Sequence, residues 1–223
     1  MKHILLDTNV LVNYYERGSK SAFMRLLHQN AQQHRALLHI SNVCIAEVFK
    51  IFASHCFCEK TITPDTYWRI KEQFSRDVTR SFRYAAPQLY HEFRLTAYHI
   101  VHADLVFRRA MEYLQAHDRD GACTPGKHIS TMDLLLIAQG IEMNHLHGDD
   151  NVMVLTGDKL LYDIGVNLRA HDTPEEKAAC IAQHPTPEIL ANIAPFRYPR
   201  VEYFHASDIT NTMVAFLGGH RGA

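Results

Sequence analysis

Two aspartates stand where carboxylates at the edge of a sheet could work together. Asp7 follows the apolar stretch Ile4–Leu6, and Asp158 follows the apolar stretch Val152–Leu155. Each is therefore expected near the carboxyl end of a buried strand, and in open parallel sheets ligands bind in the crevice outside those ends. Taken singly, each aspartate could instead be a turn residue or a helix N-cap, which are common roles for Asp.

Two further acids are expected on helices. Glu47 lies on a helical face that is otherwise apolar, where an ionised carboxylate is costly unless it is paired or bound to a cation. An ion pair with Lys50, three residues on, is the alternative. Asp133 lies three residues after Ser130 and directly before the apolar run Leu134–Ile137. A capping box, with Asp in place of the usual Glu, is the alternative to metal binding here.

The four acids are more informative together than singly. Strand ends and the starts of the helices between them meet at one edge of a doubly wound sheet. Carboxylates packed together there would repel one another and raise their pKa values unless a cation lay between them. Oxygen ligands of this kind suit Mg²⁺ or Mn²⁺, and a pair of such ions about 4 Å apart could activate water for displacement at phosphorus. The predicted metal ligands and catalytic residues are Asp7, Glu47, Asp133 and Asp158.

Alternating strands and helices at both ends of the chain would position these acids. Strands are predicted at residues 3–6, 36–40 and 152–155, with further strands near 166–168 and 201–204. Helices are predicted between them, at residues 42–54 and 130–144 among others. This alternation predicts an α/β fold whose central parallel sheet is covered by helices on both faces.

The middle of the chain is predicted to be helical. One amphipathic helix begins at Thr63-Pro64, and a second, longer helix runs from Pro87 to about His117. The loop Asp120–Gly126 would close this arm, which occupies about residues 60–127.

The pattern changes again after Asp172. Helix starts are predicted at Thr173-Pro174 and Thr186-Pro187, and a last helix after Ser207. We expect residues 1–170 to form one domain with the arm inserted in it. Residues 171–223 would then be a C-terminal extension packed on the same domain.

Four segments resemble the conserved motifs of the PIN-domain ribonucleases. Asp7-Thr8-Asn9 resembles the first motif, and Ser41 with Glu47 resembles the second. The segment Ser130–Ala138 resembles the third, and Val154–Asp158 resembles the fourth. Their order and local context also match, over about residues 1–58 and 128–170.

The resemblance implies a three-layer α/β/α sandwich and hydrolysis of phosphodiester bonds in single-stranded RNA with Mg²⁺ or Mn²⁺. Asp7 and Asp133 would be the principal metal ligands, and Glu47 would complete the acidic pocket. Asp158 would bind a second ion or orient the attacking water. Four polar residues would hold these carboxylates in position: Thr8, Asn9, Ser41 and Thr156.

The resemblance extends to the VapC toxins of toxin–antitoxin pairs. It implies that an antitoxin protein is a candidate partner beside single-stranded RNA, and a homodimer is a candidate assembly. The long stretch between Glu47 and Asp133 and the tail after Asp172 depart from the compact toxins.

Net charge is −1, which does not by itself indicate nucleic-acid binding. The segment from Arg69 to Arg109 is nevertheless basic, with eight Lys or Arg against four acids. The candidate RNA-binding residues in it are Arg69, Lys71, Arg76, Arg80 and Arg83. A solvated helix face of mixed charge is the alternative. Aromatic residues among them, such as Tyr67 and Trp68, could stack on RNA bases or pack in the core.

Other features bound the class of protein. Five cysteines without C-x-x-C spacing indicate free thiols in a reducing compartment, which predicts the cytoplasm. No apolar signal core is present, and the longest apolar run, Leu134–Ala138, is too short to cross a bilayer.

The sequence allows three alternative interpretations. Sixteen scattered histidines lack a His-Glu-x-x-His motif, which argues against zinc. An aspartyl phosphatase normally carries a second Asp where this chain has Asn9. A PIN-fold module that binds RNA or protein through its helical arm, without catalysis, is the main alternative.

Overall fold

The computed structural model describes residues 1–18, 20–83, 89–117, 129–183, 187–188 and 197–218. Five strands form one parallel sheet in the order β3-β2-β1-β4-β5. Their bounds are β1 Lys2–Leu6, β2 Ala36–Ser41, β3 His91–Phe93, β4 Val152–Thr156 and β5 Arg200–Tyr203. The predicted α/β class with a central parallel sheet is confirmed.

The chain divides into two compact units. Unit 1 comprises residues 1–94, 155–157 and 202–223, and unit 2 comprises residues 95–154 and 158–201. The helices of unit 1 are α1 Thr8–Arg17, α2 Ser21–Gln32, α3 Asn42–Ala53, a π-helical turn Ser54–Cys58, α4 Pro64–Arg83 and α10 Ile209–Phe216. Those of unit 2 are α5 Ala97–His117, α6 Thr131–His147, a 3₁₀ turn Asp149–Asn151, α7 Lys159–Ala170 and α8 Pro174–Ala182.

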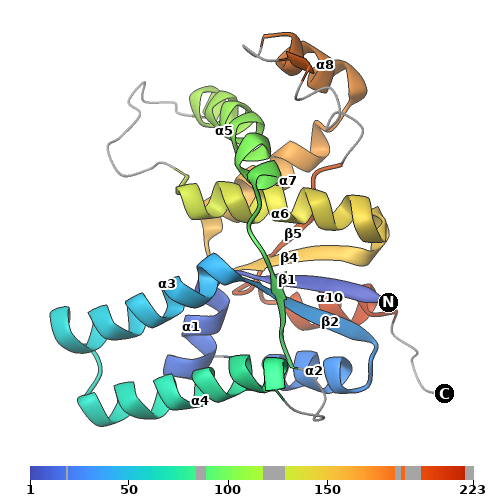
Figure 1. The fold of residues 1–223 in the computed structure, drawn as a ribbon. Coiled ribbons are helices and arrows are strands. Elements are labelled where there is room, and N and C mark those ends of the chain that lie inside the picture. The colour runs from blue at the N-terminus through green and yellow to red at the C-terminus, as the bar shows by residue number, and fades with distance from the viewer. Residues whose placement is uncertain (19, 84–88, 118–128, 184–186, 189–196, 219–223) are drawn as a thin grey trace. The chain divides into compact units, whose positions relative to one another are not determined.

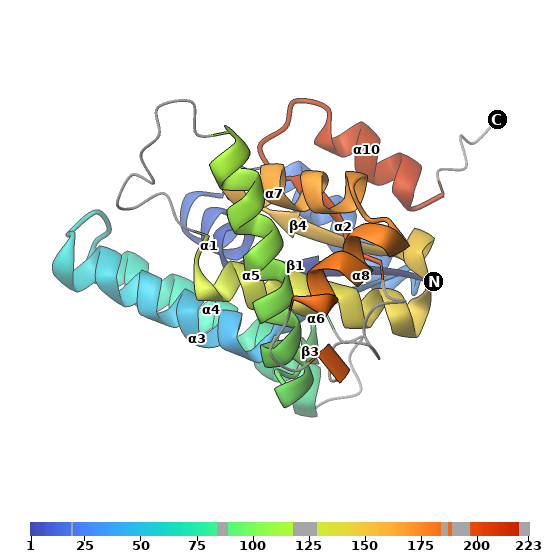
Figure 2. The same cartoon turned by 90° about the horizontal axis from the view of Figure 1, so that it is seen from above.

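Phe74 of α4 organises the helix packing of unit 1. Its ring meets those of Tyr15 on α1 and of Phe49 and Phe52 on α3, with centroids 5.1, 5.1 and 6.1 Å away. Phe74 and Phe52 are fully buried. The apolar stripe of α4 therefore packs against α1 and α3, and α3 and α4 lie side by side as an antiparallel pair (Figures 1 and 2).

Hydroxyl groups extend this packing to the start of β3. The Tyr15 hydroxyl donates to Asp77 Oδ2 at 2.7 Å and lies 3.1 Å from the Tyr90 hydroxyl, which lies 3.1 Å from His28 Nε2. Burial lowers the pKa of His28 to about 4, so the ring is neutral at pH 7. A chain of hydrogen bonds therefore joins α1, α2 and α4 to the segment that leads into β3.

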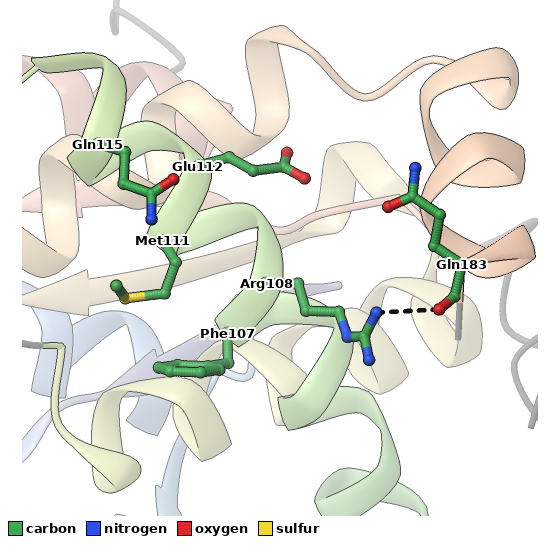
Figure 3. A pocket seen from close by; sticks show the side chains of 6 residues that line it. All are labelled: Phe107, Arg108, Met111, Glu112, Gln115 and Gln183. Carbon is green, nitrogen blue, oxygen red and sulfur yellow. Dashed lines mark hydrogen bonds between the residues drawn. The ribbon is translucent and has the colours of Figure 1, made fainter. Parts of the chain in front are cut away.

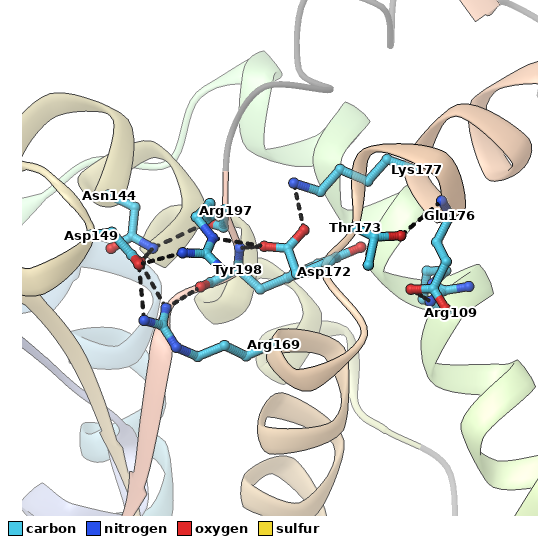
Figure 4. A network of polar contacts seen from close by, with 10 residues as sticks. All are labelled: Arg109, Asn144, Asp149, Arg169, Asp172, Thr173, Glu176, Lys177, Arg197 and Tyr198. Carbon is cyan, nitrogen blue, oxygen red and sulfur yellow. Dashed lines mark hydrogen bonds and ion pairs between the residues drawn. The ribbon is translucent and has the colours of Figure 1, made fainter.

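Ion pairs tie the segment before β5 to α6 and α7 within unit 2 (Figure 4). Arg169 donates to both oxygens of Asp149, at 2.7 and 3.0 Å, and to the Tyr198 carbonyl at 2.7 Å. Asp172, whose side chain is fully buried, pairs with Lys177 at 2.5 Å and accepts from the Tyr198 N–H at 2.8 Å. These bonds fix the path of the chain as it enters the last strand.

Two predicted elements are wrong. The helix predicted from Pro87 to His117 is interrupted, because His91–Phe93 pairs with β2 as β3 and α5 begins only at Ala97. The strand predicted near residues 166–168 is part of α7, whose buried face of Leu161, Ile164 and Leu168 has helical spacing.

The remaining predicted helix and strand boundaries that fall on described residues agree with the structure to within a few residues. The loop Asp120–Gly126 lies outside the described residues, and so does Thr186 at the predicted helix start Thr186-Pro187. In the part of the chain that is described, no helix combines the length and apolarity needed to cross a membrane.

Gly165→Ala should destabilise unit 2. A Cβ at Gly165 would lie 2.4 Å from Val201 Cγ2 and 2.9 Å from Val201 Cβ, so α7 has to move away from β5. Overpacking of this kind costs about 1–3 kcal/mol, which urea denaturation will measure. Val166→Ala, at an exposed position on the same helix, is the control and should change stability by less than about 0.5 kcal/mol. Equal stability of both variants would contradict this packing.

Candidate functional site

Asp7 occupies a helix N-cap position without capping the helix. It directly follows β1 and precedes α1, and its side chain makes no capping hydrogen bond. The carboxylate instead accepts a 2.6 Å hydrogen bond on Oδ2 from the Thr156 hydroxyl at the end of β4. The Asp7 N–H donates to the Leu155 carbonyl at 3.0 Å, and only 5% of the residue is exposed. The acid is thus held between two strand ends.

Glu47 is held by the residue that follows Asp7. The Thr8 hydroxyl donates to Glu47 Oε2 at 2.6 Å, which connects the start of α1 to the second turn of α3. No ion pair joins Glu47 to Lys50 or to any other described residue, so the alternative of a salt bridge is wrong. Ser41 caps α3 by accepting from the Val43 N–H at 3.4 Å, which sets where the helix begins.

Cys44, which is not among the predicted site residues, lies within this acidic group. Burial raises the pKa of its thiol to about 12, with Asp7 and Glu47 adding to the rise and hydrogen bonding to Thr8 opposing it. The cysteine is therefore a neutral thiol at pH 7. Its spacing of three residues from Glu47 on one helix was the signal available in the sequence.

Asn9 has no side-chain hydrogen bond to another described residue. Its carbonyl accepts from the Asn13 amide at 2.7 Å. A Cβ at Gly157 would lie 3.0 Å from Asn9 Cβ, so a larger residue there would press against the start of α1. The role predicted for Asn9 in holding a carboxylate stays a prediction.

Asp133 and Asp158 belong to unit 2, where both carboxylates cap helices. Asp133 Oδ2 accepts from the Ser130 N–H at 3.0 Å, and Ser130 Oγ accepts from the Asp133 N–H at 3.2 Å, which completes a capping box on α6. Asp158 Oδ1 accepts from the N–H groups of Leu160 and Leu161 at 2.7 and 3.1 Å at the start of α7. The capping alternative is therefore confirmed for both residues, with Asp133 Oδ2 and Asp158 Oδ1 accepting the capping hydrogen bonds.

Of the four predicted ligands, unit 1 brings Asp7 and Glu47 together around Thr8 and Cys44. Among the described residues, no group of three or more His, Cys, Asp or Glu side chains is placed to hold a metal ion. Convergence of all four carboxylates on one ion stays a prediction.

The basic residues predicted to bind RNA differ in their surroundings. Arg69 is exposed, and Lys71 Nζ lies 4.9 Å from the Trp68 ring centroid and 5.5 Å from that of Tyr67. Arg76 is paired with Glu72 one turn away. The side chains of Arg80 and Arg83 lie outside the described part of α4.

Unit 2 holds a cavity of about 260 Å³ on α5, and none of its lining residues is a predicted site residue (Figure 3). Six residues line it: Phe107, Arg108, Met111, Glu112, Gln115 and Gln183. Arg108 closes one side by donating to the Gln183 carbonyl at 3.4 Å. The lining contains no pair of carboxylates, so the cavity does not offer the chemistry expected of Asp7 and Glu47.

Buried histidines on α5 form a second polar group in unit 2. His99 Nε2 lies 2.5 Å from Glu142 Oε2 on α6. His102 is fully buried, its ring lies edge-on to Tyr98 with centroids 3.8 Å apart, and neither ring nitrogen has a hydrogen-bond partner among the described residues. Burial and neighbouring His99 lower the pKa of His102 to about 3.

Comparisons with protein-family models and with curated proteins find no match to this chain.

His102 should make unit 2 sensitive to acid. In the unfolded chain its pKa is near 6.5, so below that pH the unfolded state takes up a proton that the folded state refuses until about pH 3. Stability should therefore fall by up to about 1.4 kcal/mol per pH unit across this window. His102→Phe should lower the slope by the share of His102, up to about 1.4 kcal/mol per pH unit, and leave the share of His28, as measured by urea denaturation at pH 7 and pH 5. His171→Gln, at an exposed position, should keep the full slope. If the unfolding free energy of His102→Phe falls with pH as steeply as that of the parent, groups other than His102 cause the loss of stability in acid.

Proposed function

We propose that this chain is a metal-dependent endoribonuclease of the PIN type that hydrolyses single-stranded RNA. The observation that carries the proposal is the position of Asp7. A buried carboxylate that stands at an N-cap but does not cap, and that is held instead by a hydroxyl from another strand, is positioned for a ligand rather than for its own helix.

The donor set of unit 1 suits Mg²⁺ or Mn²⁺. Asp7 and Glu47 supply carboxylate oxygens, and Mg²⁺ is commonly bound through one or two carboxylates while it keeps several waters. Mg²⁺ and Mn²⁺ prefer such oxygen ligands to the thiol of the neighbouring Cys44. In the proposal, Asp133 and Asp158 are further metal ligands, as the resemblance to PIN domains implies.

Two threonines orient the carboxylates of Asp7 and Glu47. Thr8 and Thr156 each donate one hydrogen bond, which fixes the rotamers of Glu47 and Asp7 and offsets part of the cost of burying negative charge. When bound, the cation lowers the pKa of a water and stabilises charge on the leaving oxygen of an in-line displacement. The carboxylates hold the ion and orient the water by accepting its hydrogen bonds.

The wider proposal includes the three-layer PIN sandwich and a cytoplasmic role. A toxin paired with an antitoxin protein, and a homodimer, are the assemblies proposed from the resemblance. Candidate RNA contacts lie on α4. The second candidate function is a non-catalytic module that binds RNA or protein through α4, and the 58% exposure of Trp68 favours it as an added or separate activity.

Asp7→Asn and Glu47→Gln should each abolish Mn²⁺-dependent cleavage of a single-stranded RNA, because each removes a charged ligand without changing side-chain size. Both should also lose the rise in melting temperature that millimolar Mn²⁺ gives the parent, since a ligand that binds only the folded state stabilises it. Glu112→Gln, an exposed acid paired with Arg109, is the matched control and should keep both properties. If the Asp7 and Glu47 variants cut as fast as the parent, the site assignment is wrong. If the parent neither cuts nor responds to Mn²⁺, the non-catalytic module is favoured.

Thr8→Val should weaken Mn²⁺ binding by about 10- to 100-fold, because Glu47 loses the hydroxyl that orients it. Thr8→Ser, which restores a hydroxyl, should recover most of the affinity. Melting curves over a Mn²⁺ titration measure both. A Thr8→Val protein with the affinity of the parent would mean that this hydrogen bond is not part of a metal site.

A further inference from the structure

Two exposed aromatic rings and a lysine, with a buried tyrosine between the rings, form a surface in unit 1 at the joined ends of α3 and α4. This aromatic surface consists of Phe57, Tyr67, Trp68 and Lys71. The Phe57 and Tyr67 centroids are 5.1 Å apart, and those of Tyr67 and Trp68 are 5.0 Å apart, both pairs edge to face. Phe57 is 59% exposed and Trp68 is 58% exposed.

Local structure holds these rings outside the core. On α4, Tyr67, Ile70 and Phe74 face inward and are buried, so the neighbouring position 68 has to face outward. After α3 the chain makes a π-helical turn, Ser54–Cys58, in which the Glu59 N–H donates to the Ser54 carbonyl at 2.9 Å. Turns of this kind are often found at functional sites. The turn places Phe57 against Tyr67 rather than in the core.

The charges beside the rings favour an anionic partner. Lys71 and Arg69 form no ion pair with any residue that the structure describes. The acids nearby are largely engaged, since Glu72 pairs with Arg76 and Glu59 lies 3.8 Å from His55. Asp65 remains, in the first turn of α4, where the helix dipole favours a negative charge. The surface therefore combines flat apolar rings with available positive charge.

We propose that this aromatic surface binds single-stranded nucleic acid, with bases stacking on Trp68 and Phe57 and phosphates contacting Lys71 and Arg69. Base stacking on aromatic rings beside a cation is the usual way in which proteins hold single strands without reading sequence. The inference rests on the proposed function and deepens it, because it assigns a separate substrate-holding surface to the same unit.

The spacing along α3 suits such a role. Phe57 lies ten residues after Glu47, along α3 and the π-helical turn that continues it, which corresponds to at most about 15 Å. At about 3.4 Å per stacked nucleotide, this is a span of roughly four nucleotides. A short strand can therefore reach from the aromatic surface to the carboxylates of unit 1.

Trp68 is the only tryptophan of the chain, so its fluorescence reports directly on this surface. The parent protein, kept in EDTA so that RNA stays intact, is titrated with an oligouridylate of about 12 nucleotides, within the usual site sizes of single-strand binding proteins. Stacking should quench the emission to a plateau, and added salt should weaken the binding. A duplex of the same length should quench far less, because its bases are already stacked.

Variants then locate the binding, with anisotropy of a labelled oligouridylate as the readout. Trp68→Ala should lower the affinity by about 5-fold or more, Lys71→Met should lower it and reduce its salt dependence, and Trp68→Phe should keep most of it. Leu146→Ala, which removes an equally exposed apolar side chain from α6, should bind as the parent does.

Unchanged tryptophan emission at saturating oligouridylate, or equal binding by Trp68→Ala and Trp68→Phe, would overturn the proposal. If the two Trp68 variants bind equally, the aromatic surface would instead bind a protein partner or a second copy of this chain. Sedimentation at rising protein concentration detects self-association. Asp7→Asn keeps the two proposals apart. If the Asp7→Asn variant still binds oligouridylate at Trp68 but also cleaves RNA as fast as the parent, only the catalytic proposal fails. If RNA cleavage is lost in Asp7→Asn but oligouridylate does not change the Trp68 emission of the parent, only the nucleic-acid-binding surface is ruled out.

Discussion

The burial of charge at Asp7 is the constraint around which the first unit is arranged. A carboxylate that is 5% exposed needs strong hydrogen-bond donors or a cation to offset its desolvation. The Thr156 hydroxyl supplies one donor, and the Asp7 N–H pairs with Leu155, so the ends of β1 and β4 are held together at this residue. An N-cap side chain is worth about 1 kcal/mol to a helix, and α1 does without it. A residue that stands at an N-cap position without capping its helix departs from the local pattern, and such departures are expected at functional positions.

Asp133 and Asp158 show what the same residue type does when the helix uses it. Both cap their helices through one oxygen, in the manner expected of a Ser-x-x-Asp box and of an Asp before a helix. An ionised carboxylate has two oxygens and about four lone-pair directions, so capping does not exclude metal binding. Capping fixes the rotamer, and a fixed rotamer lowers the entropy lost when an ion binds. Asp133 and Asp158 therefore cap their helices, whereas the Asp7 carboxylate makes no capping hydrogen bond.

Local patterns predicted the parts of the fold that depend on local burial. The apolar stretches of β1 and β4 and the caps Ser41 and Ser130 are visible in the sequence because neighbouring residues determine them. Strand β3 was missed, since three half-buried residues without alternation owe their conformation to pairing with β2. The false strand near Val166 arose from β-branched propensity, which the helical burial of α7 overrides. The contacts of Thr8 and Thr156 followed the predicted motifs, but the place of Cys44 among the acids depends on how α1 meets α3.

Composition alone could not rank the basic and aromatic residues of α4. Tyr67 and Trp68 are adjacent, so one faces the core and the other faces solvent whenever the helix buries a single stripe. Lys71 and Arg76 carry the same charge, yet Arg76 has an acid one turn away and Lys71 has aromatic rings. A cation that already has a carboxylate partner must give it up to bind phosphate. Lys71 lies over the exposed Trp68 ring and the buried Tyr67 ring, and keeps its full charge available. A count of eight basic residues therefore says less about nucleic-acid binding than the neighbours of each one.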